Sequence, residues 1–193
     1  ILKKTFKKNY MDITGQILAS MPSLKDERFY QTVIYICAHS KDGSMGIIIN
    51  KKIDYDLFPN LLQQLGIDKK IRGKKILVRY GGPVESERGF ILHSDDFIHK
   101  ESLTIDNGVA LTSTLEFFKN LNTGTGPKHS ILALGYAGWG PGQLEKEIQE
   151  NSWLTIPIES SFLFDDEIST KWQKAYKLIG IDSFSISQFS GKA

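Results

Sequence analysis

The sequence lacks the residues that most metal sites and covalent crosslinks require. It has one cysteine, Cys37, and four histidines among 193 residues, with no Cys-x-x-Cys or His-x-x-x-His spacing. A lone thiol excludes an internal disulfide and fits a reducing compartment, and the missing ligand spacings argue against structural zinc. No apolar run approaches the roughly 18 residues of a membrane-spanning helix. We therefore expect a cytoplasmic protein with no metal, no cofactor and no membrane contact.

Acidic residues slightly outnumber basic ones outside the N-terminus. Four lysines and no acid occur among the first ten residues, so residues 11–193 carry a formal charge of −2 although the whole chain carries +2. A weakly acidic body argues against a large nucleic-acid surface, because phosphate affinity comes from clustered Lys and Arg. A helix-turn-helix with a basic recognition helix is also missing. We treat residues 1–10 as a flexible basic extension, native or added, and residues 11–193 as a single domain.

The patterns that are present predict an α+β fold. A content of 40% hydrophobic and 24% charged residues is typical of a globular domain. Short β-branched and aromatic runs predict strands at 15–21, 32–39, 45–50, 75–80, 90–93, 102–105, 109–112, 131–134 and 153–158, with a weak edge strand at 181–189. Helical spacing predicts helices at 57–65, 114–121, 143–150 and from 165 or 166 to 179. Hairpins mixed with three or four helices indicate a mixed, largely antiparallel sheet.

Two local patterns make sharper predictions. Strict alternation along residues 32–39 would place Cys37 and His39 on one strand face, about 6.5 to 7 Å apart, which is too far for a direct hydrogen bond without bent side chains. Cys37 and His39 could form a nucleophilic pair. The structural alternative is a buried thiol beside a histidine at the end of the strand. Ser113 and Glu116 form a capping box that would open the helix at 114–121.

The stretch from Gly135 to Gly142 reads as a glycine-rich loop between a buried strand and a helix. Such a loop can cradle phosphate with free backbone N–H groups. The Walker pattern is absent, and the dinucleotide pattern has Gln143 where its third glycine belongs. We therefore favour a structural loop in which Trp139 packs against a neighbour, with ligand contact as the alternative. The acidic residues of the following helix are expected to form a solvated face.

A second candidate surface begins at Gly81-Gly82-Pro83-Val84-Glu85. It continues through Arg88 to His93 and combines tight-turn residues with both signs of charge. Loops of this kind carry binding sites more often than cores do. A salt-bridged connection between two strands is the equally weighted alternative.

Several distinct short motifs follow one another along the chain. They are Gly15–Pro22 (GQILASMP), Val33–His39 (VIYICAH), Gly43–Gly46 (GSMG) with Asn50, Gly81–Val84 (GGPV) with Arg88–Phe90 (RGF), Gly124–Pro127 (GTGP) and Leu134–Trp139 (LGYAGW) with Gly142–Leu144 (GQL). Together they resemble the bacterial AlgH/YqgE family over about residues 13–165. The chain departs from the family where an acidic residue commonly precedes the histidine, here Ala38, and where proline often follows Asn50, here Lys51-Lys52.

The resemblance implies a cytosolic protein with a bent mixed sheet that approaches a pseudo-barrel, and it implies no assigned biochemical activity. The family also carries a transcriptional-regulator label, which derives from a proposed role in alginate synthesis. The departures at Ala38 and Lys51-Lys52 weaken any catalytic role for the strand at 37–39. A regulatory role would pass through a protein partner or a small ligand, because nothing in the sequence supports direct DNA contact.

Three functions remain open from the sequence. We favour a non-enzymatic binding or regulatory protein that uses a groove formed by the segments at 81–93, 124–127 and 135–143. The expected contact residues are Gly81, Gly82, Pro83, Glu85, Arg88, His93, Gly126, Gly138, Trp139, Gln143, His39 and Asn50. The first alternative is an enzyme, for example a hydrolase, with His39, Cys37 or His93 as reactive groups. The second, direct DNA binding, is the least favoured.

Overall fold

A curled β-sheet forms the centre of the molecule. The structure is a computed structural model that describes residues 11–53, 59–64, 70–71, 74–75, 77–106 and 108–182. Neighbouring strands of the sheet run in the order β11-β1-β2-β3-β10-β7-β9-β8, all antiparallel, and β6 joins β10 in parallel. Its strands are β1 (Ile17–Ser20), β2 (Val33–Ser40), β3 (Gly43–Ile48), β6 (Val78–Tyr80), β7 (Val84–Ser94), β8 (Leu103–Thr104), β9 (Val109–Thr112), β10 (Ser130–Trp139) and β11 (Trp153–Ile156).

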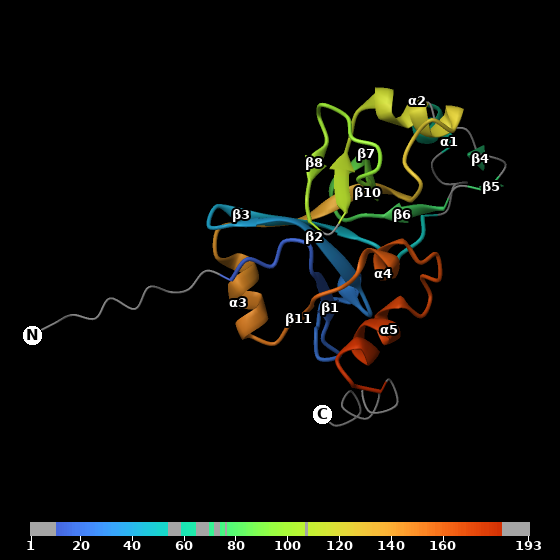
Figure 1. The fold of residues 1–193 in the computed structure, drawn as a ribbon. Coiled ribbons are helices and arrows are strands. Elements are labelled where there is room, and N and C mark those ends of the chain that lie inside the picture. Colours follow the sequence, from blue (N-terminus) through green and yellow to red (C-terminus); the bar gives the residue numbers. More distant parts are fainter. Residues whose placement is uncertain are drawn as a thin grey trace, which may run out of the picture.

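Short helices cover this sheet, which curls into a half-barrel (Figure 1). The helical elements are η1 (Glu27–Phe29), α1 (Pro59–Gln64), α2 (Leu115–Thr123), α3 (Gln143–Gln149), α4 (Ser160–Phe164) and α5 (Lys171–Leu178), and β4 (Lys70–Ile71) pairs with β5 (Lys74–Lys75) as a separate ribbon. The expected α+β fold with a bent, largely antiparallel sheet is therefore confirmed. In Figure 1, α2 lies at the end of the molecule that carries β8, whereas α3 and α5 lie at the end that carries β1 and β11.

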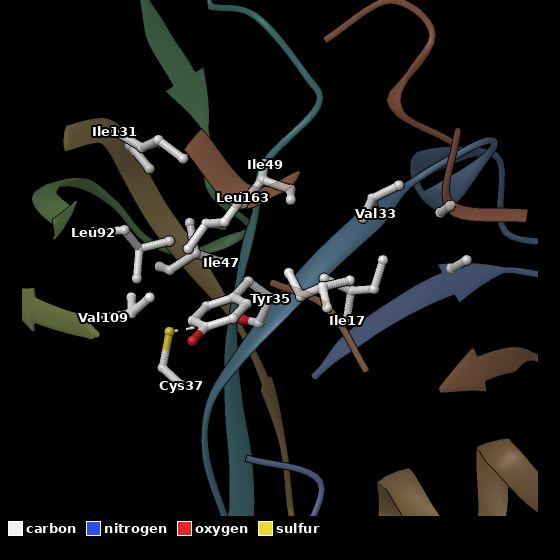
Figure 2. Close-up of a cluster of buried hydrophobic side chains, with 14 of the residues drawn as sticks. Ile17, Val33, Tyr35, Cys37, Ile47, Ile49, Leu92, Val109, Ile131 and Leu163 are labelled. Carbon is white, nitrogen blue, oxygen red and sulfur yellow. Dashed lines mark hydrogen bonds between the residues drawn. The ribbon is translucent and has the colours of Figure 1, made fainter. Parts of the chain in front are cut away.

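Period-two alternation along the strands separates an inner core from two outer ones. The inner core lies within the curl and takes Tyr35 and Cys37 from β2, Leu92 from β7 and Trp172 from α5. Figure 2 shows Tyr35 and Cys37 pointing into this core beside Val109, with the Cys37 thiol near the carbonyl oxygen of Tyr35. Alternate residues face outward, where α3 and α2 each cover one patch of the sheet. Both faces are therefore buried, which explains why these strands are apolar on both sides.

The alternation breaks at Cys37, and this corrects the predicted Cys37–His39 pair. The register between β2 and β3 shifts between Ile36 and Ala38, so Cys37 is the extra residue of a β-bulge. A bulge reverses which side chains face each side of the strand. Cys37 keeps the phase of Tyr35 and points into the inner core, whereas His39, beyond the bulge, lies beside Glu145 of α3. The two side chains do not share a face, because periodicity assumes an unbroken ladder.

Three predicted boundaries are also wrong. The expected loop at Gly135–Gly142 is strand as far as Trp139, because β10 continues and pairs with β3. The helix expected from Asp165 starts at Lys171, and the separate helix α4 precedes it. Thr114, rather than Ser113, caps α2 by accepting from the Phe117 N–H.

The strand β7 also begins earlier than predicted, at Val84 rather than at residue 90. The hairpins β2–β3 and β8–β9, the helix α3 and the strand β11 are confirmed. The ends of the helix predicted at 57–65, Asn107 of the second hairpin turn and most of the weak strand at 181–189 lie outside the described residues.

Candidate functional site

Two backbone segments cross in direct contact where β6 leads into β7. Gly82 has a φ of 150° and Gly135 a φ of 73°, both in the region that favours glycine. A Cβ on Gly82 would lie 2.1 Å from the Tyr136 carbonyl carbon, and one on Gly135 would lie 2.3 Å from the Gly82 carbonyl oxygen. The glycines of the Gly-Gly-Pro-Val motif are therefore required because two backbone segments of the chain pass too closely for a side chain to fit between them.

Beyond this crossing, β7 bulges away from β10. Val84 pairs with Tyr136 and Gly89 pairs with Leu134, so residues 85–88 form a wide bulge opposite Gly135. We call these four residues, Glu85 to Arg88, the 85–88 segment; all of them are exposed. Glu85 adopts a φ of 46°, which is uncommon for a residue with a side chain. The segment is a charged projection held by a rigid backbone crossing.

The Arg88 side chain is oriented on three sides. Its guanidinium donates to the Glu85 carboxylate at 3.0 Å and to the Ser113 hydroxyl at 2.9 Å. It also lies over the Phe90 ring, 5.2 Å from the ring centre, and that ring meets Tyr136 edge to face. A shallow, open depression of about 540 Å³ is lined by Pro83 and the 85–88 segment. The arrangement therefore presents an ordered cation beside aromatic surface.

A second group of predicted residues gathers around α3. The Glu147 carboxylate accepts from the indole N–H of Trp139 at 2.9 Å and of Trp153 at 2.8 Å. Its other oxygen accepts from the Gln143 amide at 2.9 Å, and the Gln143 amide oxygen accepts from the Gly140 N–H. We call Trp139, Gln143, Glu147 and Trp153 the α3 cluster. It corrects the expected solvated acidic face, because Glu147 anchors two largely buried tryptophans.

His39 lies beside Glu145 of α3 and is not part of the α3 cluster. Its Nδ1 is 2.6 Å from the Ser44 hydroxyl, and its Nε2 is 3.9 Å from the Glu145 carboxylate. The side chain is only 2% exposed. Cys37 is fully enclosed in the inner core, and burial raises the pKa of its thiol far above the ordinary value. A buried thiol with a raised pKa is a poor nucleophile.

His93 belongs to a buried polar chain under α2. Its Nδ1 is 2.9 Å from the Ser94 carbonyl oxygen, which can only accept, so Nδ1 carries the proton. Nε2 must then accept from the Thr112 hydroxyl at 2.8 Å, and Thr112 in turn accepts from Ser102 at 2.6 Å. Burial lowers the pKa of His93, which keeps the ring neutral near pH 7. The chain ends at Ser102, which is half-buried.

Two further predicted residues stabilise turns. The Asn50 side chain accepts from the Val33 N–H and donates to the Gln31 carbonyl, each at 2.8 Å, and so ties β2 to the chain after β3. Gly126 lies against Leu121 at the end of α2. The predicted contact residues therefore fall into separate neighbourhoods: the crossing and the 85–88 segment, the α3 cluster, the His93 chain and these turns.

Sequence reasoning missed two buried cations. Arg79 on β6 is 1% exposed and Lys171 on α5 is fully buried. Lys and Arg are almost never fully buried unless they are paired. In the sequence, Arg79 reads as the polar residue of an alternating strand and Lys171 as one of several helix lysines. Only the packing of α5 against the sheet reveals their burial.

Neither a metal centre nor a membrane span emerges from the described part of the chain. Within the residues that the structure describes, no three His, Cys, Asp or Glu side chains gather closely enough to hold a metal ion. Across the same residues, none of the helices is long and apolar enough to cross a bilayer.

Sequence comparison finds similar proteins across most of the chain. A family model described as AlgH-like matches residues 17–184. A UPF0301 protein of Afipia carboxidovorans is 47% identical and covers 95% of this chain and 90% of its own length. A UPF0301 protein of Beijerinckia indica is 47% identical and covers 94% of this chain and 92% of its own length.

Solved structures share the same architecture. The solution structure of the AlgH protein from Pseudomonas aeruginosa has a TM-score of 0.73 and 31% identity, and the match covers 94% of each chain. The crystal structure of a Corynebacterium diphtheriae protein has a TM-score of 0.64 at 18% identity, covering 95% of this chain and 94% of that one. The second likeness, at that identity, concerns the fold alone.

Proposed function

This chain belongs to the AlgH-like family, and on that basis we propose that it is a cytoplasmic, non-enzymatic binding protein with a regulatory role. Its binding surface would be the 85–88 segment together with Val84 and Tyr136. The ligand would be a protein segment or a small molecule that carries an acidic group next to an apolar one. Direct contact with nucleic acid is not part of this proposal, because the chain outside residues 1–10 is weakly acidic.

The orientation of Arg88 is the observation that carries the proposal. Glu85, Ser113 and the Phe90 ring fix its guanidinium on an exposed projection. A side chain that is already ordered loses little entropy when it binds a ligand. Arginine recognises carboxylates through paired N–H donors, and an acidic ligand could replace Glu85 at this position.

The apolar part of the ligand would lie on neighbouring exposed surface. Val84 is 36% exposed although it belongs to a strand, and Tyr136 is half-buried beside it, with Gly138 leaving the tyrosine ring accessible from one side. Exposed apolar side chains next to a positioned charge are typical of binding surfaces. The Gly82–Gly135 crossing holds both parts rigidly.

The separation of the reactive groups argues against catalysis. Cys37 lies in the inner core, His39 beside α3 and His93 under α2. A general base must reach the group that it activates within hydrogen-bond distance. The three residues named as reactive candidates therefore do not meet at one site.

A thermal-shift screen tests the proposal. Nucleotides, acyl compounds and acidic metabolites would be tested with the wild type, with Arg88→Ala and with the matched variant Arg28→Ala. Arg28 is also exposed and is paired with a nearby carboxylate, Asp26 at 2.7 Å. A ligand at the proposed surface should stabilise the wild type and Arg28→Ala but not Arg88→Ala. A ligand that stabilises all three proteins equally would place binding elsewhere.

A hydrolytic enzyme remains a second candidate because of the Ser102–Thr112–His93 chain. The Ser102 hydroxyl donates to Thr112, and the Thr112 hydroxyl donates to the neutral His93 ring. A serine linked to a base by hydrogen bonds is the usual form of an activated nucleophile. Labelling with a fluorophosphonate probe tests it, with Ser102→Ala as the variant and Ser86→Ala, an exposed serine, as the control. Absence of labelling in the wild type would remove this candidate.

A further inference from the structure

Arg79 and Lys171 form a buried pair of like charges, remote from the 85–88 segment. Arg79 is 1% exposed and Lys171 is fully buried, and each lies close enough for its charge to affect the other. Burying a charge costs free energy unless an opposite charge compensates for it. The partners of the two side chains therefore show whether the pair is complete. We call Arg79 and Lys171 the buried cation pair.

The partners of Lys171 satisfy its hydrogen bonds but not its charge. Its ammonium donates to the carbonyl oxygens of Phe162 at 2.7 Å, Leu163 at 3.3 Å and Asp165 at 2.7 Å. These are the carbonyls at the C-terminal end of α4, which otherwise have no helical partner. Three donors meet three acceptors, yet carbonyl groups carry only partial charge. The full positive charge of Lys171 stays in the interior.

Arg79 is incompletely paired. Its Nη2 lies 3.7 Å from the Asp166 carboxylate, which is too long for a hydrogen bond, and the Asp166 side chain is 93% exposed. The buried Nε–H has no hydrogen-bond partner among the residues that the structure describes. Nε and Nη2 lie on the same edge of the guanidinium, which is the donor edge that oxyanions bind through two parallel hydrogen bonds. At that edge the Nε–H therefore keeps an unused capacity to donate a hydrogen bond.

Among the residues that the structure describes, the charges around the pair leave one positive charge in excess. The Asp165 carboxylate is used by the Lys174 ammonium and by the Glu167 N–H. Asp166 is thus the acid that remains to compensate both buried cations, and it is largely in water. Burial lowers the pKa of Arg79 and of Lys171, as expected for cations without full compensation.

We propose that the Nε–Nη2 edge of Arg79 binds an oxyanion, the carboxylate or phosphate group of a ligand, which displaces Asp166. The anion would accept two hydrogen bonds from Arg79, and the charge of Lys171 would strengthen its binding without direct contact. Asp166 would act as an exposed competitor that occupies the edge weakly when the ligand is absent. This site is separate from the surface of the proposed function, so either can fail without the other.

Inorganic phosphate and acetate are suitable probes, titrated at constant ionic strength against potassium chloride. Chloride is a single atom and cannot bridge the two donors as an oxyanion does. The readout is the Arg79 Nε–H resonance in ¹H–¹⁵N spectra, assigned by its loss in Arg79→Met, together with thermal stability. The matched control is Arg28→Ala, which removes an exposed arginine and should leave the response unchanged.

Asp166→Asn separates binding from folding, because Asp166 is exposed and its replacement should leave the fold intact. We expect this variant to bind the probe at least about threefold more tightly than the wild type, since one competing charge is gone. A response to phosphate alone would identify a phosphate ligand, and a response to acetate alone a carboxylate ligand. If the Arg79 resonance moves with neither probe in the wild type or in Asp166→Asn, the proposal is wrong, whatever the stability of Arg79→Met.

Discussion

Two regions of this protein enclose charged side chains, Glu147 partly and the buried cation pair almost completely, and they compensate the charges to different extents. In the α3 cluster, one carboxylate, Glu147, meets three N–H donors from Trp139, Trp153 and Gln143. In the buried cation pair, the Lys171 ammonium meets backbone carbonyls and the face of the Phe162 ring but no carboxylate among its hydrogen-bond partners. Arg79 keeps a buried N–H without a partner among the described residues. Both regions fasten a helix to the same sheet, so the difference does not arise from the architecture.

This difference indicates a structural role for the α3 cluster and a ligand-binding role for the buried cation pair. A buried polar group whose hydrogen bonds are all formed has no donor left for a ligand. A group with an unpaired donor, in contrast, is stabilised when a ligand accepts that hydrogen bond. We therefore expect the α3 cluster to dominate stability and the buried cation pair to respond to solution conditions. Substitutions that remove one side of this contrast should therefore have effects of different size.

The largest effect should come from Glu147→Ala. The substitution leaves the Trp139 and Trp153 indole N–H groups without their acceptor, and each lost buried partner costs about 1 to 3 kcal/mol. We expect the free energy of unfolding to fall by about 3 kcal/mol, measured by urea denaturation. The control is Glu150→Ala, because Glu150 forms only an exposed pair with Lys146 at 3.7 Å. Equal losses in the two variants would mean that the cluster is not closed by Glu147.

Lys171→Met should have the next largest effect. It leaves three carbonyl groups at the end of α4 without a donor, but it also removes a buried charge, so the two contributions partly cancel. We expect a loss of about 2 kcal/mol in urea denaturation. Arg79→Met removes a charge whose hydrogen bonding is incomplete, and it should change stability by less than about 1 kcal/mol. A larger loss for Arg79→Met than for Lys171→Met would reverse the roles assigned to the pair.

The contrast between these regions could be predicted from the sequence only in part. Helical spacing predicted α3, because helix periodicity depends on residues close in the chain. The bulge at Cys37 and the continuation of β10 through Gly135 depend on partner strands, β3 and the Gly82 crossing, which no local pattern encodes.

The buried cation pair illustrates the same limit. Lysine and arginine are exposed by default, so a sequence argument assigns Arg79 and Lys171 to solvent. Their burial follows from the position of α5 across the end of the inner core, which already holds Trp172 and Tyr176. The Gly-Gly-Pro-Val motif, in contrast, was visible as a candidate surface, because glycine and proline mark special backbone positions.

The pH dependence of stability should expose the uncompensated charge. Burial, reinforced by the charge of Arg79, lowers the pKa of Lys171 to about 8 from an ordinary 10.5. Between these two values the unfolded chain binds more protons than the folded protein, so stability rises with pH. We expect the wild type to gain about 1 kcal/mol relative to Lys171→Met from pH 8 to pH 9 in urea denaturation. If the three carbonyl groups instead keep the Lys171 ammonium protonated up to its ordinary pKa, the free energy of unfolding will change with pH equally in the wild type and the variant.

Tyrosine ionisation sets the upper limit of this experiment. Burial raises the pKa of Tyr176 to about 12 from an ordinary 10, so the folded protein keeps a proton that the unfolded chain has lost. Above pH 10 this term makes stability fall as pH rises, opposite in sign to the Lys171 term. Cys37 contributes in the same sense as Tyr176 from about pH 8, because burial raises the pKa of its thiol above the ordinary 9.0. Both contributions cancel in the difference between the wild type and Lys171→Met, which therefore reports on Lys171.

The smallest effect on stability should come from Arg88→Ala. Arg88 is a charged residue with three oriented partners, yet its side chain is 52% exposed and Glu85 is 47% exposed. Exposed ion pairs contribute about 0 to 1 kcal/mol because water already solvates both charges. We expect a loss below about 0.5 kcal/mol, measured against Arg28→Ala in the same urea series. A loss near that of Lys171→Met would show that Arg88 holds the bulge together, and its orientation would then be a requirement of the fold and no evidence for a ligand.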